Sequence, residues 1–421
     1  MTQAPKAQDL EAQDLNPSSL LIPAVSYEPL TWRPTHNPDA SKREIARQTG
    51  TYNSATTPLL AQWQPVLSTE LIIELEDAMA TLRDYEQHVL SSLPPNTIAL
   101  GPLASILLRT ESASSSQIEH LTSSAKQLAL AELDQGKHNA VLVLANVRAM
   151  QAALRLSESL SMESLLEMHS ELLAGDPTMI EHAGNLRTQT VWIGGRDSAG
   201  PIGSSFVPPT HHRVPSALAD LESFIQRDDL PALMHAAVAH AQFETIHPFV
   251  DGNGRTGRAL VHAMLRGRDV SQSFVLPVSS GILTNLDSYF DALTAFRNGD
   301  AEPIVRVFTR ATRYAASRGM TLVDQLVREL RESEAKLAGV RRHAKAWDLL
   351  PALLGQPVIN TEFVKAQLGI NDAAAARALA TLTDRGVLHE TTGNSRNRIW
   401  QHNGVLSALD AYAARIRRDS R

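Results

Sequence analysis

The 421-residue sequence contains no cysteine, so it has neither disulfide bonds nor thiolate zinc sites. Aromatic residues make up only 5% of the chain, and no segment approaches the apolar length that a membrane span needs. The first residues carry acidic side chains where a signal peptide needs a long apolar run. We therefore expect a folded cytoplasmic protein that has no membrane partner.

Charge is moderate but unevenly distributed. The net charge of −6 argues against a protein that coats nucleic acid with its whole surface. Residues 338–421 hold 12 Lys/Arg and 7 Asp/Glu, a net +5, which leaves −11 for the preceding residues. This asymmetry indicates a separate C-terminal module with its own partner. The length also exceeds one ordinary domain, so we expect two or three.

The most informative stretch is residues 247–258, which read HPFVDGNGRTGR. Apolar periodicity predicts helices at 234–245 and 256–265 on either side of it. Gly252 and Gly254 allow backbone angles that other residues avoid, so successive N–H groups can form an anion-binding nest at the N-terminus of the second helix. The alternative is a plain helical corner whose glycines act as caps. The charged residues beside the glycines favour a phosphate-binding loop.

Four side chains of this loop suggest its chemistry. Arg255 and Arg258 supply forked donors that suit phosphate oxygens. Asp251 is the candidate Mg²⁺ ligand, because Mg²⁺ prefers a carboxylate together with substrate phosphates and water. His247 is the candidate general base for an attacking hydroxyl, since an imidazole ordinarily titrates at roughly pH 6.5.

The loop resembles the signature of the Fic (filamentation induced by cyclic AMP) family, HPFx[DE]GNGRxGR, at every fixed position. The resemblance extends over roughly residues 20–312. It implies a mainly α fold with a Fic-type helical core, a β-hairpin flap, an N-terminal helical extension and a C-terminal winged-helix domain. The implied reaction is transfer of AMP from ATP to a Ser, Thr or Tyr hydroxyl of a target protein, or of the chain itself, with Mg²⁺ bound. Relatives that transfer the terminal phosphate carry lysine at the position of Gly254, so this glycine favours AMP transfer.

The resemblance also assigns roles to individual residues of the loop. Phe249 is expected to anchor the loop in the helical core. Tyr289 lies in a segment that resembles the one closing the adenine pocket, although a core aromatic is an equal alternative. The residues expected to bind the nucleotide are Gly252, Asn253, Gly254, Arg255, Gly257, Arg258 and Tyr289.

A second motif lies upstream. Ser115 and Glu119 match the first five positions of the inhibitory motif [S/T]xxxE[G/N], and His120 departs from the sixth. The resemblance implies that the Glu119 carboxylate pairs with the guanidinium of Arg258, the group that the γ-phosphate of ATP would otherwise bind. The alternative is a capping serine followed by a surface glutamate.

A hairpin is predicted from β-branched residues at 188–193, two glycines, and a return strand at 204–207. It resembles the family's flap, which holds an extended target segment by strand addition. A plain surface hairpin is the alternative. The residues expected to contact the target are Gln189, Val191, Trp192 and Ile193.

Three histidines raise the question of a metal site, but their spacing argues against one. His235, His240 and His247 are five and seven residues apart, which does not match the i, i+4 pair of a zinc-binding helix. His169 lies on the apolar face of the helix predicted at 162–174, where a hydrogen-bonded core histidine is expected. We predict no zinc site.

The C-terminal residues predict two helices, 361–368 ended by Gly369 and 372–385, followed by strands at 387–391 and 396–401. This order resembles a winged helix. Arg377, Arg396 and Arg398 would suit DNA phosphates. The alanine-rich second helix has few side chains able to read bases, so protein contact or homodimer formation is an equal expectation.

The chain is thus divided into a disordered tail (1–20), an N-terminal helical region with the inhibitory motif (21–130), a catalytic core (131–312), a linker helix (313–345) and a winged-helix-like domain (346–421). Residues 27–57 are expected to lie irregularly across the helical body. Two other functions stay open: a hydrolase that removes AMP from a modified target, with Glu119 orienting water, and a nucleotide-sensing DNA-binding regulator.

Overall fold

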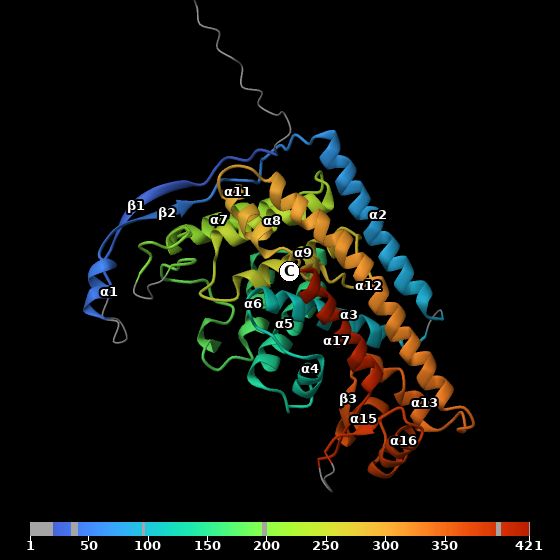
Figure 1. Cartoon of the computed structure of the whole chain (residues 1–421). Coiled ribbons are helices and arrows are strands. Elements are labelled where there is room, and N and C mark those ends of the chain that lie inside the picture. Colours follow the sequence, from blue (N-terminus) through green and yellow to red (C-terminus); the bar gives the residue numbers. More distant parts are fainter. Residues whose placement is uncertain (1–19, 35–40, 95–96, 196–199, 393–396, 421) are drawn as a thin grey trace, which may run out of the picture.

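The computed structural model describes residues 20–34, 41–94, 97–195, 200–392 and 397–420 (Figure 1). The tail predicted at 1–20 lies outside these ranges except for Leu20. That residue is fully buried, and its carbonyl accepts a hydrogen bond from the Ala301 N–H at 2.9 Å. Within the ranges described, no helix combines the length and the apolar composition that crossing a membrane requires.

The predicted mainly α-helical fold is confirmed. Its centre is a pair of buried helices, α8 (Ala232–Ile246) and α9 (Asn253–Gly267). Every residue of α8 from position 233 onward is buried, as expected for a helix that other elements surround on all sides. The pair contacts α5 (His138–Arg155), α6 (Met162–Leu173), α7 (Val214–Ile225), α11 (Leu286–Arg297) and the 3₁₀ turn η1 (Ser157–Ser159). The same part of the chain also contains α10 (Val278–Ile282) and the 3₁₀ turns η2 (Ile180–His182) and η3 (His211–Arg213).

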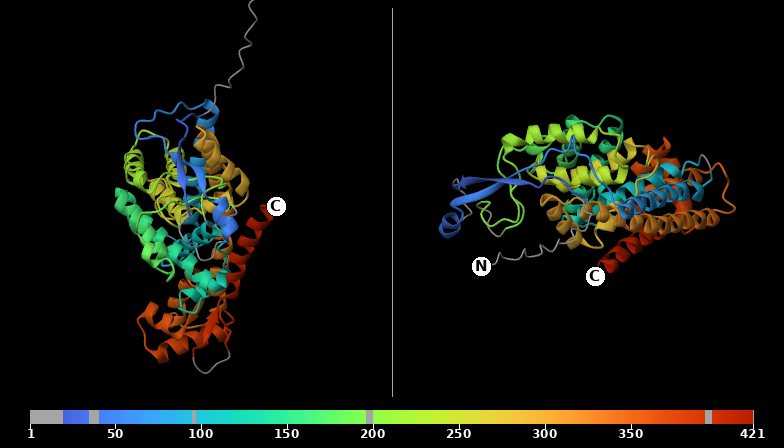
Figure 2. Two further views of the ribbon diagram at one scale, coloured as in Figure 1. Left: turned by 90° about the vertical axis from the view of Figure 1, so that its left-hand side faces the viewer. Right: turned by 90° about the horizontal axis from the view of Figure 1, so that it is seen from above.

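Two long helices lie side by side along one flank, α2 (Thr69–Ser92) and α12 (Glu302–Lys336) (Figures 1 and 2). α12 runs through most of the region predicted as a linker, and Leu322, Leu326 and Leu330 on one of its faces are buried. The next helices along the chain after α2 are α3 (Leu100–Ile118) and α4 (Ala125–Ala131). α3 contacts α5, α9 and α10, which places its C-terminal end beside the start of α9.

The expectation of an irregular segment at 27–57 was wrong. β1 (Ser26–Trp32) and β2 (Gly50–Thr56) pair in antiparallel register, with Tyr27 opposite Ala55, and α1 (Lys42–Arg47) stands between them in the sequence. The two strands project from the helical body (Figure 2, right). Proline, threonine and asparagine obscure the local strand pattern here, because the ladder depends on backbone pairing between residues far apart in sequence.

The strands predicted at 188–193 and 204–207 are absent from the described residues. Only an isolated antiparallel bridge joins Ile193 to Phe206, with the Ile193 N–H donating to the Phe206 carbonyl at 2.8 Å. Gly194 and Gly195 after the bridge adopt φ of 70° and 103°, so the chain turns before a ladder can form. The two predicted stretches thus pair in antiparallel direction, but the pairing is limited to one bridge and the paired stretches are shorter than predicted.

The C-terminal elements are α13 (Lys345–Leu349), α14 (Ala352–Gly355), β3 (Val358–Asn360), α15 (Thr361–Leu368), α16 (Asp372–Asp384), β4 (His389–Glu390), β5 (Ile399–Gln401) and α17 (Asn403–Asp419). The three strands form a sheet in the order β3-β5-β4. Both predicted helices are confirmed, with Gly369 at φ 61° after the first and Asn371 capping the second. The strands are shorter than predicted, and Arg396 lies outside the described residues. α17 returns to the helical body and packs on α12 and α4 (Figure 1).

Candidate functional site

The loop between α8 and α9 is held by its own side chains. The Asn253 amide bridges the backbone of Phe249: its Oδ1 accepts from the Phe249 N–H at 2.9 Å, and its Nδ2 donates to the Phe249 carbonyl at 3.0 Å. Gly252, at φ 76°, caps α9 in the left-handed region that favours glycine. The side chain of Asn253 thus has both of its polar atoms bonded to the Phe249 backbone. The N-terminus of α9 bounds the site that is predicted to bind phosphate.

A buried histidine fastens this loop to α6. His169 stacks on the fully buried Phe249 with ring centroids 3.6 Å apart and an interplanar angle of 5°. Its Nδ1 accepts from the Gly184 N–H at 3.1 Å, which leaves Nε2 to donate to the Asp251 carbonyl at 3.0 Å. Burial lowers the pKa of His169 to about 4, so the ring is neutral at neutral pH. This is the hydrogen-bonded core histidine that the sequence predicts.

A cleft of about 750 Å³ opens over the loop. It brings together residues from α3, α8, α9 and α11 that lie far apart in the sequence. Among the residues that line it are Glu119, Trp192, Ile193, Glu244, His247, Asp251, Gly252, Asn253, Gly254, Arg255, Arg258, Tyr289, Leu293 and Arg297. The sequence-predicted residues Gln189 and Val191 are not among its lining residues, and Phe249 and Gly257 lie behind it.

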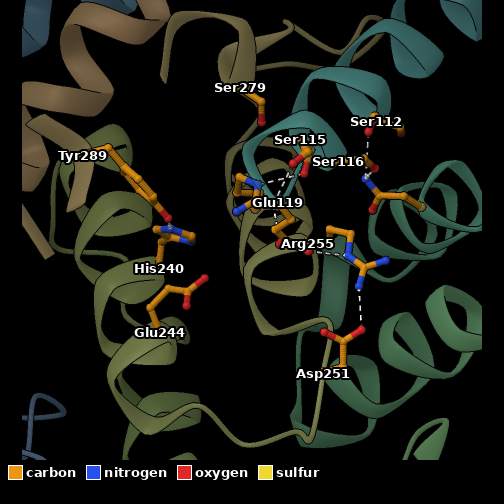
Figure 3. A network of polar contacts seen from close by, with 12 residues as sticks. Ser112, Ser115, Ser116, Glu119, His240, Glu244, Asp251, Arg255, Ser279 and Tyr289 are labelled. Atoms are coloured by element: carbon orange, nitrogen blue, oxygen red, sulfur yellow. Dashed lines mark hydrogen bonds and ion pairs between the residues drawn. The ribbon is translucent and has the colours of Figure 1, made fainter. Parts of the chain in front are cut away.

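Glu119 forms ion pairs with both arginines of the loop, Arg255 and Arg258 (Figure 3). Its Oε2 accepts from Arg255 Nε at 2.7 Å, and its Oε1 accepts from Arg258 Nη2 at 2.7 Å. Arg258 also donates to the Ser115 hydroxyl at 2.8 Å and to the Ser115 carbonyl at 2.9 Å. The sequence predicted the contact of Glu119 with Arg258, but it gave no sign of the contact with Arg255. The carboxylate fills the place where two guanidinium groups would otherwise face an anion.

Asp251 lies at the exposed side of the loop. Its carboxylate accepts from Arg255 Nη2 at 2.9 Å, and its side chain is 52% exposed. Among the residues that the structure describes, no cluster of three or more His, Asp or Glu side chains is arranged to hold a metal ion. A single exposed carboxylate beside a phosphate site fits Mg²⁺, which takes one or two carboxylates and fills its remaining positions with phosphate oxygens and water.

His247 ends α8 in a left-handed conformation, with φ 50° and ψ 63°. Its Nδ1 lies 3.7 Å from Oε2 of Glu244, one turn earlier. Burial opposes ionisation of Glu244, but His247, His240 and Arg258 hold the pKa of its carboxyl at about 2. An ionised carboxylate therefore faces one nitrogen of the candidate base. Sequence reasoning missed Glu244, although its spacing of three residues from His247 on a helix was a usable signal.

The other predicted residues of the cleft have defined partners. Tyr289 is buried and its hydroxyl lies 2.8 Å from His240 Nε2, while its ring lines the cleft. His235 Nε2 lies 2.8 Å from the Phe224 carbonyl. His235 and His240 thus have separate hydrogen-bond partners, and among the described residues the three histidines form no group arranged to hold a metal ion. Trp192 packs edge-on against Trp32 of β1, with centroids 5.8 Å apart.

Arg187 is a site residue that sequence reasoning missed altogether. It lies on the segment before the Ile193–Phe206 bridge, is 3% exposed, and donates from Nε to the His247 carbonyl at 2.8 Å. No local pattern marks it, because its partners are backbone carbonyls up to 60 residues away.

Comparison with known proteins shows what this part of the chain resembles. The model of the Fic/DOC family matches residues 159–265, which include α6, α7, α8, the loop and most of α9.

Named relatives include the protein adenylyltransferase fic-1 of Caenorhabditis briggsae, 31% identical over 176 residues that are 40% of this chain and 31% of that protein. The protein adenylyltransferase Fic of Aedes aegypti is 26% identical over 291 residues, 68% of this chain and 52% of that protein. The chain thus spans between about a third and about half of the length of these two relatives. A solved Fic family protein from Desulfovibrio desulfuricans G20 aligns with 21% identity and a TM-score of 0.47 over 81% of this chain and 98% of that one.

Proposed function

We propose that this protein transfers AMP from ATP to a hydroxyl side chain of a target protein and releases pyrophosphate. The observation that carries the proposal is the cleft in which His247, the N-terminus of α9 and the guanidinium groups of Arg255 and Arg258 meet. The names of the relatives, protein adenylyltransferases, support it. Attack by the hydroxyl oxygen on the α-phosphorus forms the new P–O bond, while the bond to the pyrophosphate oxygen breaks.

In this proposal each residue of the cleft has one task. His247 takes the proton of the attacking hydroxyl. The N–H groups around Gly252 and Gly254, together with Arg255, bind the α- and β-phosphates, and Arg258 binds the γ-phosphate. Gly257 does not line the cleft and has a packing task instead: a Cβ there would lie 3.0 Å from His240 Nδ1, so glycine lets α9 approach α8. A bound Mg²⁺, held by Asp251, would supply charge neutralisation for the triphosphate.

One task is revised from those that the resemblance alone implies, and the others are kept. The amide of Asn253 is engaged by Phe249, so we assign Asn253 to holding the loop rather than to binding phosphate. Tyr289 keeps its assignment to the nucleotide base, since its ring lines the cleft while its hydroxyl is held by His240. Trp192 and Ile193 remain the candidate contacts for the target, because both line the cleft.

We further propose that Glu119 holds the enzyme in a low-activity state. Its carboxylate forms ion pairs with Arg255 and Arg258, whose side chains are only 4% and 3% exposed. Triphosphate and carboxylate would compete for the same guanidinium groups, because both are anions that accept from the same N–H donors. The chain must move Glu119 before ATP can bind productively.

The test is incubation of the purified protein with α-labelled ATP and Mg²⁺. We expect weak labelling of protein by the wild type, stronger labelling by Glu119→Gly, and none by Glu119→Gly/His247→Ala. γ-labelled ATP gives no label if AMP is the group transferred. Absence of label from Glu119→Gly, with the chain itself and with a cell lysate as targets, would reject the proposal.

A second candidate uses the same cleft in reverse, hydrolysing AMP from a modified protein. The observation in its favour is that Glu119 and His247 line one cleft, where a carboxylate can orient water. Release of free AMP from a modified substrate by wild type, lost in Glu119→Gly, distinguishes it from transfer.

The C-terminal residues carry a separate proposal, contact with DNA or with a second copy of the chain. Arg398 is paired with Glu390 and lies over the ring of Trp400, so its charge is partly satisfied within the protein. Arg377 is exposed on α16. A salt-sensitive gel shift with DNA, weakened by Arg377→Ala, would support DNA contact. Concentration-dependent sedimentation would support a dimer instead.

A further inference from the structure

Arg187 is a buried cation whose guanidinium binds only backbone carbonyls. It is 3% exposed, and within the described ranges it forms no ion pair with an acidic side chain. Burial lowers its pKa to about 10, which still leaves it charged at neutral pH. A buried charge without a counter-charge is costly unless hydrogen bonds compensate for the lost water. The partners of Arg187 therefore indicate what the residue is for.

One set of partners belongs to the end of α8. Arg187 Nε donates to the His247 carbonyl at 2.8 Å, and Nη2 donates to the Ile246 carbonyl at 3.4 Å. The backbone N–H of Arg187 donates to the Pro248 carbonyl at 3.0 Å. The last carbonyls of a helix have no partner within it and carry partial negative charge. Arg187 thus binds three successive carbonyls that include that of the candidate base.

The other set belongs to the described parts of the segment 189–209, residues 189–195 and 200–209, which carry the Ile193–Phe206 bridge. Arg187 Nη1 donates to the Gln189 carbonyl at 3.0 Å, and Nη2 donates to the Pro209 carbonyl at 2.5 Å. These residues are the two ends of the segment. One guanidinium group therefore closes the base of the segment and fixes it to the end of α8.

The backbone of His247 needs such support. A residue with a Cβ in the left-handed region, here with φ 50°, is strained by roughly 1–2 kcal/mol, and such conformations persist where the surroundings determine them. We propose that Arg187 is the positioning residue of the base: it fixes His247 in the left-handed conformation that turns its ring to the cleft, and it keeps the segment 189–209 in register with that ring.

This inference rests on the proposed function, in which His247 is the base and Trp192 and Ile193 face the target. It also explains why an arginine is required. The guanidinium offers five N–H donors in a planar fork, whereas a lysine ammonium is a compact group with three. Lysine can keep the charge at this position but cannot reach the carbonyls of His247, Gln189 and Pro209 together.

The experiment compares Arg187→Lys and Arg187→Gln with Arg268→Lys, all in the Glu119→Gly background. Arg268 is the matched control, because its guanidinium also binds three carbonyls, those of Arg227, Asp228 and Leu230, and does not line the cleft. Three quantities are measured: self-labelling from α-labelled ATP, binding of a fluorescent methylanthraniloyl-ATP, and the rate at which diethyl pyrocarbonate modifies His247.

We expect Arg187→Lys to lower the rate of labelling about 100-fold, the loss that a small displacement of a reacting group produces. The dissociation constant of the ATP analogue should stay within about twofold, because the loop 252–258 is not among the partners of Arg187. Modification of His247, whose side chain is 19% exposed in the structure, should become several times faster. Arg268→Lys should change none of the three.

Unchanged labelling and unchanged modification in Arg187→Lys would overturn the inference. So would a parallel loss of ATP binding, which would indicate general damage to the fold. If Arg187→Gln fails to fold, the charge-retaining lysine variant decides. If the Glu119→Gly parent labels neither itself nor any protein of a cell lysate, the proposed function fails, and the rate of His247 modification still decides whether Arg187 positions the ring.

Discussion

The loop 247–258 and the end of α3, which carries the proposed inhibitory residue Glu119, meet at the same two arginines, but different kinds of contact hold them. The loop is tied by contacts between residues four apart, Phe249 with Asn253 and Asp251 with Arg255. The contacts of Glu119 with the loop span 136 and 139 residues. The loop is mostly buried and is also held by His169 and Arg187, whereas the Glu119 side chain is 26% exposed at the end of its helix. Reversible inhibition by Glu119 requires a loop that keeps its shape when the Glu119 carboxylate moves away.

The helix that carries Glu119 is itself firmly held further upstream. The fully buried Glu111 accepts from the Ser279 N–H at 3.0 Å and from the Ser279 hydroxyl at 2.5 Å, and its Oε1 lies 3.0 Å from His262 Nε2. Glu111 therefore fixes α3 to the core two turns before Glu119.

The largest expected effect comes from breaking that anchor. Glu111→Ala leaves Ser279 and His262 without their buried partner, so we expect the free energy of unfolding to fall by about 3–5 kcal/mol. Urea unfolding followed by circular dichroism measures it. Glu167→Ala is the control, since Glu167 pairs with Arg155 at the surface and should change stability by less than about 1 kcal/mol. A loss of under about 1 kcal/mol in Glu111→Ala would show that α3 is not anchored there.

Acid should loosen the loop through His169. A histidine in the unfolded chain titrates at roughly 6.5, whereas burial lowers the folded pKa of His169 to about 4. Between these values the unfolded chain binds a proton that the folded protein does not, so stability is lost as the pH falls from about 6.5 to 4. His169→Gln removes this contribution, and its stability deficit against wild type should narrow by about 2 kcal/mol between pH 7 and pH 4.5. An equal stability deficit of His169→Gln at both pH values would contradict this prediction. The control is His212→Gln, at an exposed histidine.

Asn253→Ala tests whether the loop supports itself. Both hydrogen bonds to the Phe249 backbone are lost, so we expect a destabilisation of roughly 1–3 kcal/mol and weaker binding of ATP. The control is Asn185→Ala, whose amide bonds the Glu181 carbonyl at the surface. If the two variants unfold at the same urea concentration, the loop owes its shape to other contacts.

The smallest effect belongs to the secondary contact of the inhibitory helix. Ser115→Ala removes one hydrogen bond to Arg258 and leaves Glu119 in place, so AMP transfer should rise about fivefold, the equivalent of roughly 1 kcal/mol. Ser116→Ala is the matched control, because that hydroxyl accepts from Asn146 at 3.2 Å and does not bind Arg258 (Figure 3). Equal rates in the two variants would mean that Ser115 contributes nothing to inhibition.

The same contrast explains what could be predicted from sequence. α15, ended by Gly369, and α16, capped by Asn371, depend on signals within a few residues, and both were predicted within one residue. The signals that the glycines of the loop give are equally local. The pairing of β1 with β2, the absence of strands on either side of the Ile193–Phe206 bridge, and the roles of Arg187 and Arg255 depend on partners that no sequence window contains.

Gly254 lies where the two regions touch. A Cβ at this position would lie 2.4 Å from Glu119 Oε1 and 2.7 Å from Arg258 Nη1, so the carboxylate and any side chain at 254 exclude one another. Substitutions at positions 254 and 119 should therefore show strong epistasis. In a library randomised at both positions, variants that carry a larger residue at one position should be enriched only when the other position carries a smaller residue.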